Sequence, residues 1–335
     1  MSDQIRMIDV ARRAKVGIGT VSRVINAPGS VSEATRLRVM KAIEESGYVP
    51  NLIAGSLASK RTNVIAVIVP TIGNPVFSET IEAMGDQFRE EGFHLLLGRS
   101  GESEQEAHAV VTTFLARRPD GLFIHGGSAS PPTAALLGRA GIPIVESGDL
   151  SLAENPIDMV VAYSNFAAAK AMTEHLLGQG YRRIAFVGRE TRYNDRALER
   201  QRGYCAALEE AGIKVRPELI LQCTLGFRQG AEALRLLRER DPGLEAVFFG
   251  GDVWAAGALL ECQRQGWTVP DEVAIAGFDD HEIASQTVPP LTTVRVLRSD
   301  IGRRAAQLIL GRLKGRSDLP RVVDVGFQVV KRGTA

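Results

Sequence analysis

The spacing of apolar and polar residues changes character near residue 62. Before that point, apolar residues recur every three or four positions, as they do in short amphipathic helices. After it, short continuous apolar runs alternate with amphipathic helical segments, which is the pattern of a mostly parallel sheet covered by helices. The pattern therefore predicts a small helical N-terminal part followed by a larger α/β part.

Three short helices are predicted in the N-terminal part. The first is indicated by four apolar residues at helical spacing: Ile8, Val10, Ala11 and Ala14. The second covers residues 18–26. The third begins after Ser32, whose side chain is expected to cap it, and ends at Gly47. Two helices joined by a tight turn and braced by a third form a helix-turn-helix.

The second predicted helix has glycines, Gly17 and Gly19, where it should begin. Glycine inside a helix costs about 1 kcal/mol relative to alanine. We expect Gly17 to be the N-cap and three apolar residues to enter the small core: Val21, Val24 and Ile25. The residues left to meet the DNA major groove or its phosphates are Ile18, Thr20, Ser22, Arg23 and Asn26. A three-helix bundle without a nucleic-acid role is the alternative.

Charge is distributed unevenly although the net charge is only +1. Residues 1–62 hold ten Lys and Arg against five Asp and Glu, whereas the rest of the chain has a small acidic excess. A basic head on a mildly acidic body indicates a polyanionic partner for the head. A solvated charged surface is the alternative explanation of the same excess.

Five sequence elements of the head follow one another in a characteristic order: D-V-A, T-V-S-R-V-x-N, V-S-x-x-T-R, G-Y-x-P-N and S-L. With them, this part closely resembles the N-terminal segment of the lactose-repressor family of bacterial transcription regulators. The resemblance implies a hinge helix that begins at Asn51 and becomes ordered on DNA. In it, Leu57 would insert into the minor groove and kink the operator. Gly19 stands where relatives carry a base-reading side chain.

The body contains seven apolar runs that predict buried strands: 64–70, 121–125, 142–147, 159–163, 184–188, 246–251 and 272–278. Their number and the helical segments between them suggest two similar α/β lobes with a cleft. The body also resembles the family's periplasmic-binding-protein-like core, in which crossovers return part of the C-terminal region to the first lobe. The predicted domains are 1–50 for DNA binding, 51–62 for the hinge, and 63–335 for the two-lobed effector-binding and dimerisation core.

The resemblance also implies effector contacts in the cleft. The R-x-x-G-Y element places the family's effector-binding arginine at Arg200, and "GFDD" places an acid that holds ligand hydroxyls at Asp279. Phe77, which follows Asn-Pro, matches an aromatic or apolar residue that forms a wall of the family's effector cleft. Asp252 follows Gly251 where Asn-Asp is common in the family, so the contact made by that Asn is not expected. Leu225 replaces a stacking aromatic, which argues for a non-planar ligand.

A second arginine makes the predicted cleft more basic. Arg196 lies four residues before Arg200, so a helix places both on one face. Two guanidinium groups facing a cleft favour a carboxylate or phosphate ligand. The alternative is that one of them pairs with Asp195 or Glu199. Segments of the body resemble the gluconate-repressor branch, so the expected effector is a small sugar acid such as gluconate or a ketogluconate.

These features predict a homodimeric repressor that reads a pseudo-palindromic operator and is released when the sugar acid binds. Corepression, or a neutral sugar or phosphosugar as effector, remains the alternative within the family. A sugar-binding protein without a DNA role would need an export signal, and a carbohydrate-active enzyme would need a placed acid/base pair.

Other classes of protein lack support in the sequence. The motif His125-Gly126-Gly127 has no Gly-x-Ser-x-Gly partner, Gly250-Gly251-Asp252 lacks a Walker ending, and the five histidines have no metal-ligand spacing. We therefore expect no enzyme activity, cofactor or metal. The absence of a long apolar run or a signal peptide, and three scattered cysteines, favour a cytoplasmic protein without membrane contact.

Overall fold

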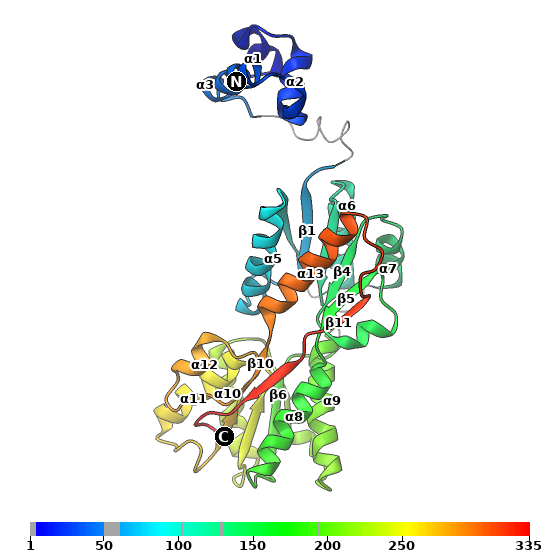
Figure 1. Cartoon of the computed structure of the whole chain (residues 1–335). Coiled ribbons are helices and arrows are strands. Elements are labelled where there is room, and N and C mark those ends of the chain that lie inside the picture. The colour runs from blue at the N-terminus through cyan, green and yellow to red at the C-terminus, as the bar shows by residue number, and fades with distance from the viewer. Residues whose placement is uncertain (1–4, 50–60, 102, 127–129, 193) are drawn as a thin grey trace. The chain divides into compact units, whose positions relative to one another are not determined.

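Apolar spacing of three and four residues folds the N-terminal part into helices (Figure 1). They are α1 (Met7–Ala14), α2 (Ile18–Asn26) and α3 (Glu33–Ser46), with a 3-10 turn, η1 (Pro28–Ser30), between the last two. The chain divides into two units, Met1–Asn63 and Val64–Ala335.

The computed structural model describes residues 5–49, 61–101, 103–126, 130–192 and 194–335. Of Asn26 and Pro28 it describes the backbone alone. The predicted DNA contacts Asn51 and Leu57 lie outside the described residues.

The core of the head forms where the three helices meet. Val10, Val21, Val24 and Val39 are buried there, and Ile25 packs against them, as predicted. Ile8, in contrast, is 43% exposed, so its assignment to the apolar stripe of α1 was wrong. The stripe is Met7, Val10, Ala11 and Ala14, at spacings of three and four residues, and Ile8 lies one position off it.

The helix ends of the head match the prediction at two positions and differ at a third. Gly17 is the N-cap of α2, with extended backbone, and Gly47 ends α3 in the left-handed region at φ +66°. Ser32 precedes α3, but its hydroxyl donates to the hydroxyl of Thr35 at 3.0 Å and makes no cap to a backbone N–H. The cap was predicted from residue type, and a nearby hydroxyl competes for the serine.

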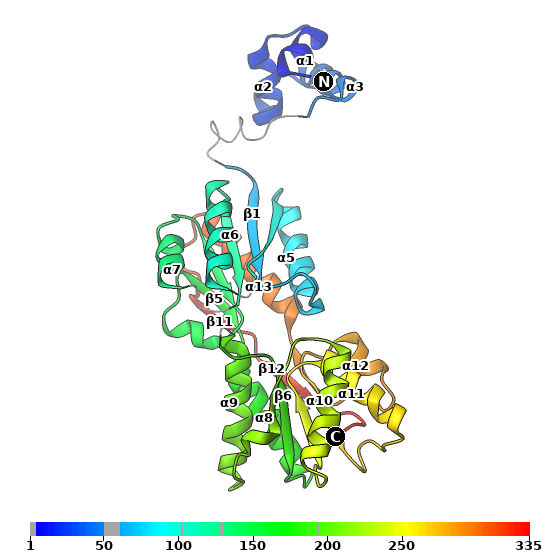
Figure 2. The same cartoon turned by 180° about the vertical axis from the view of Figure 1, so that it is seen from behind.

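The first lobe of the body is a six-stranded parallel sheet in the order β11-β5-β4-β3-β1-β2. Its strands are β1 (Val64–Val69), β2 (His94–Arg99), β3 (Gly121–His125), β4 (Ile144–Ser147), β5 (Met159–Ala162) and β11 (Val322–Asp324). Its helices are α5 (Ser78–Glu90), α6 (Glu104–Ala116), α7 (Pro131–Gly138) and α13 (Arg298–Leu313), with 3-10 turns η2 (Pro75–Phe77) and η3 (Leu150–Glu154). Figures 1 and 2 show α5 and α13 on one face and α6 and α7 on the other.

The second lobe is a four-stranded parallel sheet in the order β7-β6-β8-β9. Its strands are β6 (Ile184–Gly188), β7 (Ile220–Gln222), β8 (Ala246–Phe249) and β9 (Ala274–Ala276). Its helices are α8 (Asn165–Gly178), α9 (Asp195–Glu210), α10 (Phe227–Arg240), α11 (Asp252–Gln265) and α12 (Glu282–Gln286), with a 3-10 turn η4 (Pro217–Leu219). The helices lie on both faces of this sheet as well (Figure 2).

Three chain segments join the lobes, as the resemblance implied. The first runs from β5 to α8. The second is β10 (Thr293–Val296), which leads into α13, and the third connects β11 with β12 (Phe327–Val330). β10 and β12 pair antiparallel, and β11 pairs with β5 of the first lobe. The C-terminal region therefore contributes to both lobes, and the body is one unit.

All seven predicted runs contain a strand, because strands buried on both faces form continuous apolar segments. Five strands were not predicted: β2, β7, β10, β11 and β12. Of these, β2, β7 and β11 lie at sheet edges, and the other two form a separate ribbon. Edge strands need apolar residues on one side only, so they produce no such run.

Candidate functional site

The exposed face of α2 is the candidate DNA surface of the head. Ile18 is 47% exposed and Arg23 is exposed, whereas Thr20 and Ser22 are half-buried. Asn26 ends the helix. The neighbouring Val21 and Val24 point into the core, so the helix presents one face outward.

No steric requirement explains the glycines of α2. A Cβ built on Gly17 or Gly19 meets no atom of the described chain within 4 Å. The Nε of Arg23 donates to the carbonyl oxygen of Gly19 at 3.3 Å, so the arginine lies along the bare backbone at this position. The exposed surface of α2 between Ile18 and Arg23 therefore lacks a side chain at position 19.

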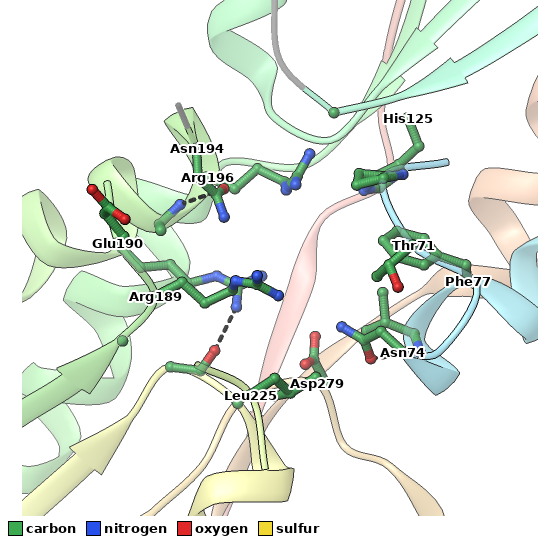
Figure 3. A pocket seen from close by; sticks show the side chains of 18 of the residues that line it. Thr71, Asn74, Phe77, His125, Arg189, Glu190, Asn194, Arg196, Leu225 and Asp279 are labelled. Atoms are coloured by element: carbon green, nitrogen blue, oxygen red, sulfur yellow. Dashed lines mark hydrogen bonds between the residues drawn. The ribbon is translucent and has the colours of Figure 1, made fainter. Parts of the chain in front are cut away.

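A cavity of about 540 Å³ lies between the two lobes of the body. It opens where parallel strands of both lobes end, which is where open α/β sheets bind ligands. Figure 3 shows Thr71, Asn74, Phe77 and His125 of the first lobe facing Arg189, Arg196 and Asp279 of the second. The predicted residues Phe77, Arg196, Arg200, Asp252 and Asp279 all line this cavity.

Arg196 is the cation most available to a ligand. It stands in the first turn of α9, and its guanidinium extends toward His125 (Figure 3). No hydrogen-bond acceptor for it lies among the residues that the structure describes. Burial, and then the charge of Arg200, lower the pKa of Arg196 to about 10, so the group stays charged at neutral pH. Such a half-buried charge, without a partner among the described residues, favours an anionic ligand.

Arg200 lies one turn along the same helix and is held by the protein itself. Its Nε donates to Oδ1 of Asn165 at 2.8 Å, one terminal nitrogen to the carbonyl of Gly250 at 2.6 Å, and the other to the hydroxyl of Tyr163 at 3.2 Å. Its guanidinium also lies 3.7 Å from the ring centroid of Phe278. The alternative, a pairing of one of these arginines with Glu199, is not found among the described contacts, in which Glu199 accepts from Arg202.

The two predicted acids differ in what their carboxylates do. Asp279 is 7% exposed and faces the cavity (Figure 3). Within the described part of the chain no group donates a hydrogen bond to its carboxylate, and Nε2 of His281, whose pKa burial lowers, lies 3.8 Å from one of its oxygens. A ligand hydroxyl can fill this role. Its φ of +111° belongs to a region that few non-glycine residues adopt.

Asp252 is fully buried, and both of its oxygens are already occupied. One accepts from the Thr293 hydroxyl at 2.6 Å and the other from the backbone N–H of His281 at 2.7 Å. Burial, and then the charge of Asp279, raise the pKa of Asp252 well above its ordinary value. Its carboxyl group therefore holds the loop that carries Asp279 in place.

His125 and Leu225 complete the walls of the cavity. The ring of Phe77 meets that of His125 edge-on with centroids 4.9 Å apart. Burial, and then the charges of Arg196 and Arg200, lower the pKa of His125 well below 6.5, so the imidazole is neutral at physiological pH. Leu225 also lines the cavity, and so does Trp254, whose indole N–H donates to the carbonyl of the neighbouring Thr224 at 2.8 Å.

Sequence reasoning missed several residues that line the cavity, among them His125, Asn74 and Arg189. It also missed the hydrogen bond by which Asn165 holds Arg200. His125 was interpreted as structural because no catalytic or metal motif accompanies it. Its place at the carboxyl end of a predicted strand was the signal that could have found it.

The described residues contain no group of three or more His, Cys, Asp or Glu side chains that could hold a metal ion. Within the same part of the chain, none of the helices combines the length and the apolar content needed to span a bilayer.

Comparisons with known proteins agree with this architecture. The profile described as "Bacterial regulatory proteins, lacI family" matches residues 6–51, and that of a "Periplasmic binding protein-like domain" matches residues 173–335. The HTH-type transcriptional regulator GntR of Escherichia coli (strain K12) is 33% identical over 327 residues, 97% of each chain. The GntR regulator of Pseudomonas aeruginosa is 35% identical over 325 residues, 97% of this chain and 94% of the relative.

Solved structures show the same arrangement. A transcriptional regulator of this family from Silicibacter pomeroyi has a TM-score of 0.92 and 33% identity, covering 98% of this chain and 99% of its own. A complex of the transcriptional regulator CelR with cellobiose has a TM-score of 0.72 and 30% identity, covering 99% and 100%. The chain belongs to the lacI family of bacterial regulatory proteins, and it is a DNA-binding transcriptional repressor rather than an enzyme.

Proposed function

We propose that a small sugar acid, such as gluconate or a ketogluconate, binds the interlobe cavity and releases this repressor from its operator. The observation that carries the proposal is the charged, half-buried Arg196, which faces the cavity without an acceptor among the described residues. Guanidinium groups match carboxylates with two parallel hydrogen bonds. A carboxylate at this position would neutralise a charge that no described residue pairs.

The polarity of the cavity supports a hydroxy acid. Several helices begin directly after residues that line it, among them α6 after Ser103, α9 after Asn194 and α11 after Gly251. Helix N-termini favour anions, and they add to the field of the arginines. Asp279 lies on the other side of the space from Arg196 in Figure 3. The acid group would bind at Arg196, and ligand hydroxyls would donate to Asp279.

The other predicted contacts take supporting roles in this proposal. Phe77 forms an apolar wall, Arg200 ties together the segments around the cavity, and Asp252 positions the loop of Asp279. Leu225 in place of an aromatic ring disfavours a purine. A neutral sugar is the second candidate, because the related CelR structure was solved as a complex with cellobiose.

On DNA, we propose that two copies of the chain bind as a homodimer in the cytoplasm and read a pseudo-palindrome. The α2 residues Ile18, Thr20, Ser22, Arg23 and Asn26 would contact each half-site, and Asn51 and Leu57 the centre. The effector would act through lobe closure. It can shift the DNA-competent state only by binding the two lobe arrangements with different affinity.

Isothermal titration of the full-length protein tests the effector class. The ligands are gluconate, 2-ketogluconate, the uncharged gluconamide, a neutral hexose and a purine. We expect heat from an acid and at least tenfold weaker binding of gluconamide, the size of effect that one charge-assisted contact supplies. Binding of the neutral hexose alone would overturn the acid assignment.

A gel-shift assay with DNA from upstream of the gene tests the mechanism. Binding should prefer this DNA over random sequence and weaken with added salt. Addition of the sugar acid should release the DNA. Tighter binding with the acid would establish corepression in place of induction.

A further inference from the structure

Two glycines of the first lobe lie directly against the guanidinium of Arg196. Gly126 follows β3 and Gly148 follows β4, and the N–H of Gly126 donates to the carbonyl of Ser147 at 2.8 Å, which joins the two strand ends. A Cβ built on Gly126 would lie 2.2 Å from a terminal nitrogen of Arg196. One built on Gly148 would lie 3.3 Å from the same nitrogen. Arg196, a second-lobe residue, therefore reaches across to the first-lobe backbone.

The backbone conformation of both residues also requires glycine. Gly126 has φ +96° and Gly148 has φ +132°, a range that side-chain-bearing residues rarely adopt. Two separate constraints, backbone conformation and close approach of a side chain, thus coincide at each position. The result is a surface of bare backbone that accommodates the planar guanidinium.

Arg200 supports this surface through Asn165. The side-chain nitrogen of Asn165 donates to the carbonyl of Gly148 at 2.8 Å, while its oxygen accepts from Arg200 at 2.8 Å. Asn165 is fully buried, so this connection is shielded from water. The immobile arginine of α9 therefore anchors the backbone against which the available arginine rests.

We propose that Gly126 and Gly148 form a seat that positions Arg196 and thereby determines the preference of this cavity for an acid over its neutral counterpart. The proposal rests on the proposed sugar-acid function and adds the residues that create its selectivity. A side chain at position 126 would occupy the place of the guanidinium. Since the far end of an arginine is flexible, the guanidinium would move away from the strand ends.

The test compares Gly126→Ala with Gly180→Ala. Gly180 has nearly the same φ, +98°, but a Cβ there meets no atom of the described chain within 4 Å. Both substitutions place a Cβ on a residue with nearly the same positive φ, and only the first contacts Arg196. The measured quantity is the ratio of the dissociation constants for gluconamide and gluconate in the full-length protein.

We expect Gly126→Ala to lower this ratio about tenfold or more, and Gly180→Ala to leave it unchanged. In an Arg196→Ser background, Gly126→Ala should cause no further loss, because the two residues act as a unit. An unchanged ratio in Gly126→Ala, or an equal decrease of the ratio in Gly180→Ala, would contradict the proposal that these glycines position Arg196.

Crystal structures of the ligand-free proteins separate this proposal from the proposed function. In Gly126→Ala the guanidinium of Arg196 should move off the strand ends, whereas in Gly180→Ala it should stay in place. A wild-type protein that does not prefer the acid would overturn the sugar-acid function and with it the role in selectivity. A guanidinium that does not move in Gly126→Ala would overturn the seat itself.

Discussion

The Nε of Arg200 donates to the Oδ1 of Asn165 at 2.8 Å, across the start of two helices of the second lobe. Asn165 uses its amide fully, since it also donates to the carbonyl of Gly148 and to the carboxylate of Asp149 and accepts from the Tyr163 hydroxyl. It stands where the first crossover enters the second lobe. This one buried side chain connects the crossover, the cavity wall and the helix α9, whose first turns line the cavity.

Replacement of Asn165 should therefore destabilise the body strongly. Asn165→Ala leaves buried partners unsatisfied, and we expect a loss of about 2–4 kcal/mol in the free energy of unfolding. Urea denaturation of the full-length protein measures it. The matched control is Ser164→Ala, which removes the α8 cap to the N–H of Ala167 and should cost about 1 kcal/mol. Equal losses in both variants would contradict a network role for Asn165.

His125 should make stability depend on pH below 6.5. Its pKa is depressed in the folded state, so the unfolded chain takes up a proton that the folded chain refuses. Stability is then unaffected above pH 6.5 and falls as the pH drops below it, by about 1.4 kcal/mol at pH 5.5. His125→Gln should remove this contribution to the pH dependence of the free energy of unfolding, as measured by urea denaturation at pH 7.5 and 5.5.

The exposed His94 is the control for this measurement. In His94→Gln, the free energy of unfolding should differ between pH 7.5 and pH 5.5 by the same amount as in the wild type. The same slope in His125→Gln as in the wild type would show that His125 is protonated in the folded protein.

Asp279→Asn should weaken the binding of gluconate and of the uncharged gluconamide to the same extent. Asparagine tolerates positive φ, so the backbone at +111° can persist. Loss of the charged acceptor for ligand hydroxyls should lower the affinity for gluconate and for gluconamide about tenfold each, as measured by titration calorimetry. Because Asp279 is buried and accepts no hydrogen bond from a described residue, loss of its charge should not lower the melting temperature. A change confined to gluconate would assign Asp279 to the acid end of the ligand.

Leu57→Ala should reduce the preference for operator over random DNA. Because Gly19 places no side chain on the exposed surface of α2, we expect heavier reliance on DNA deformation at the operator centre. Fluorescence anisotropy with operator and scrambled duplexes should show at least a tenfold lower specificity ratio. Binding to the scrambled duplex should keep its salt dependence, because the phosphate contacts are unchanged. An unchanged specificity ratio would show that Leu57 does not read the operator.

The candidate site could be predicted in part. The spacing of four residues between Arg196 and Arg200 was sufficient to place both in one cavity, because α9 is a helix. Their different roles could not be predicted. The acceptors that immobilise Arg200 come from Asn165 and Gly250, which lie 35 and 50 residues away in the chain.

The two acids illustrate the same limit. Asp252 and Asp279 both follow a strand of the second lobe, and both carry the same charge. The Thr293 hydroxyl donates a hydrogen bond to the carboxylate of Asp252, whereas no described group donates one to the carboxylate of Asp279. Which carboxylate is available to a ligand depends on a third segment of the chain that neither local pattern contains.

By itself, the sequence determined the helical head, the α/β body and the family, because amphipathic spacing, buried apolar runs and ordered motifs are local properties of the chain. The tertiary structure decided which charges remain unpaired and which glycines are needed. Gly126 and Gly148 are separated by 22 positions from one another and by many more from Arg196, yet they meet at one point. Strand order and crossovers bring such distant residues into contact. The local spacing of residues along the chain contains no information about these contacts.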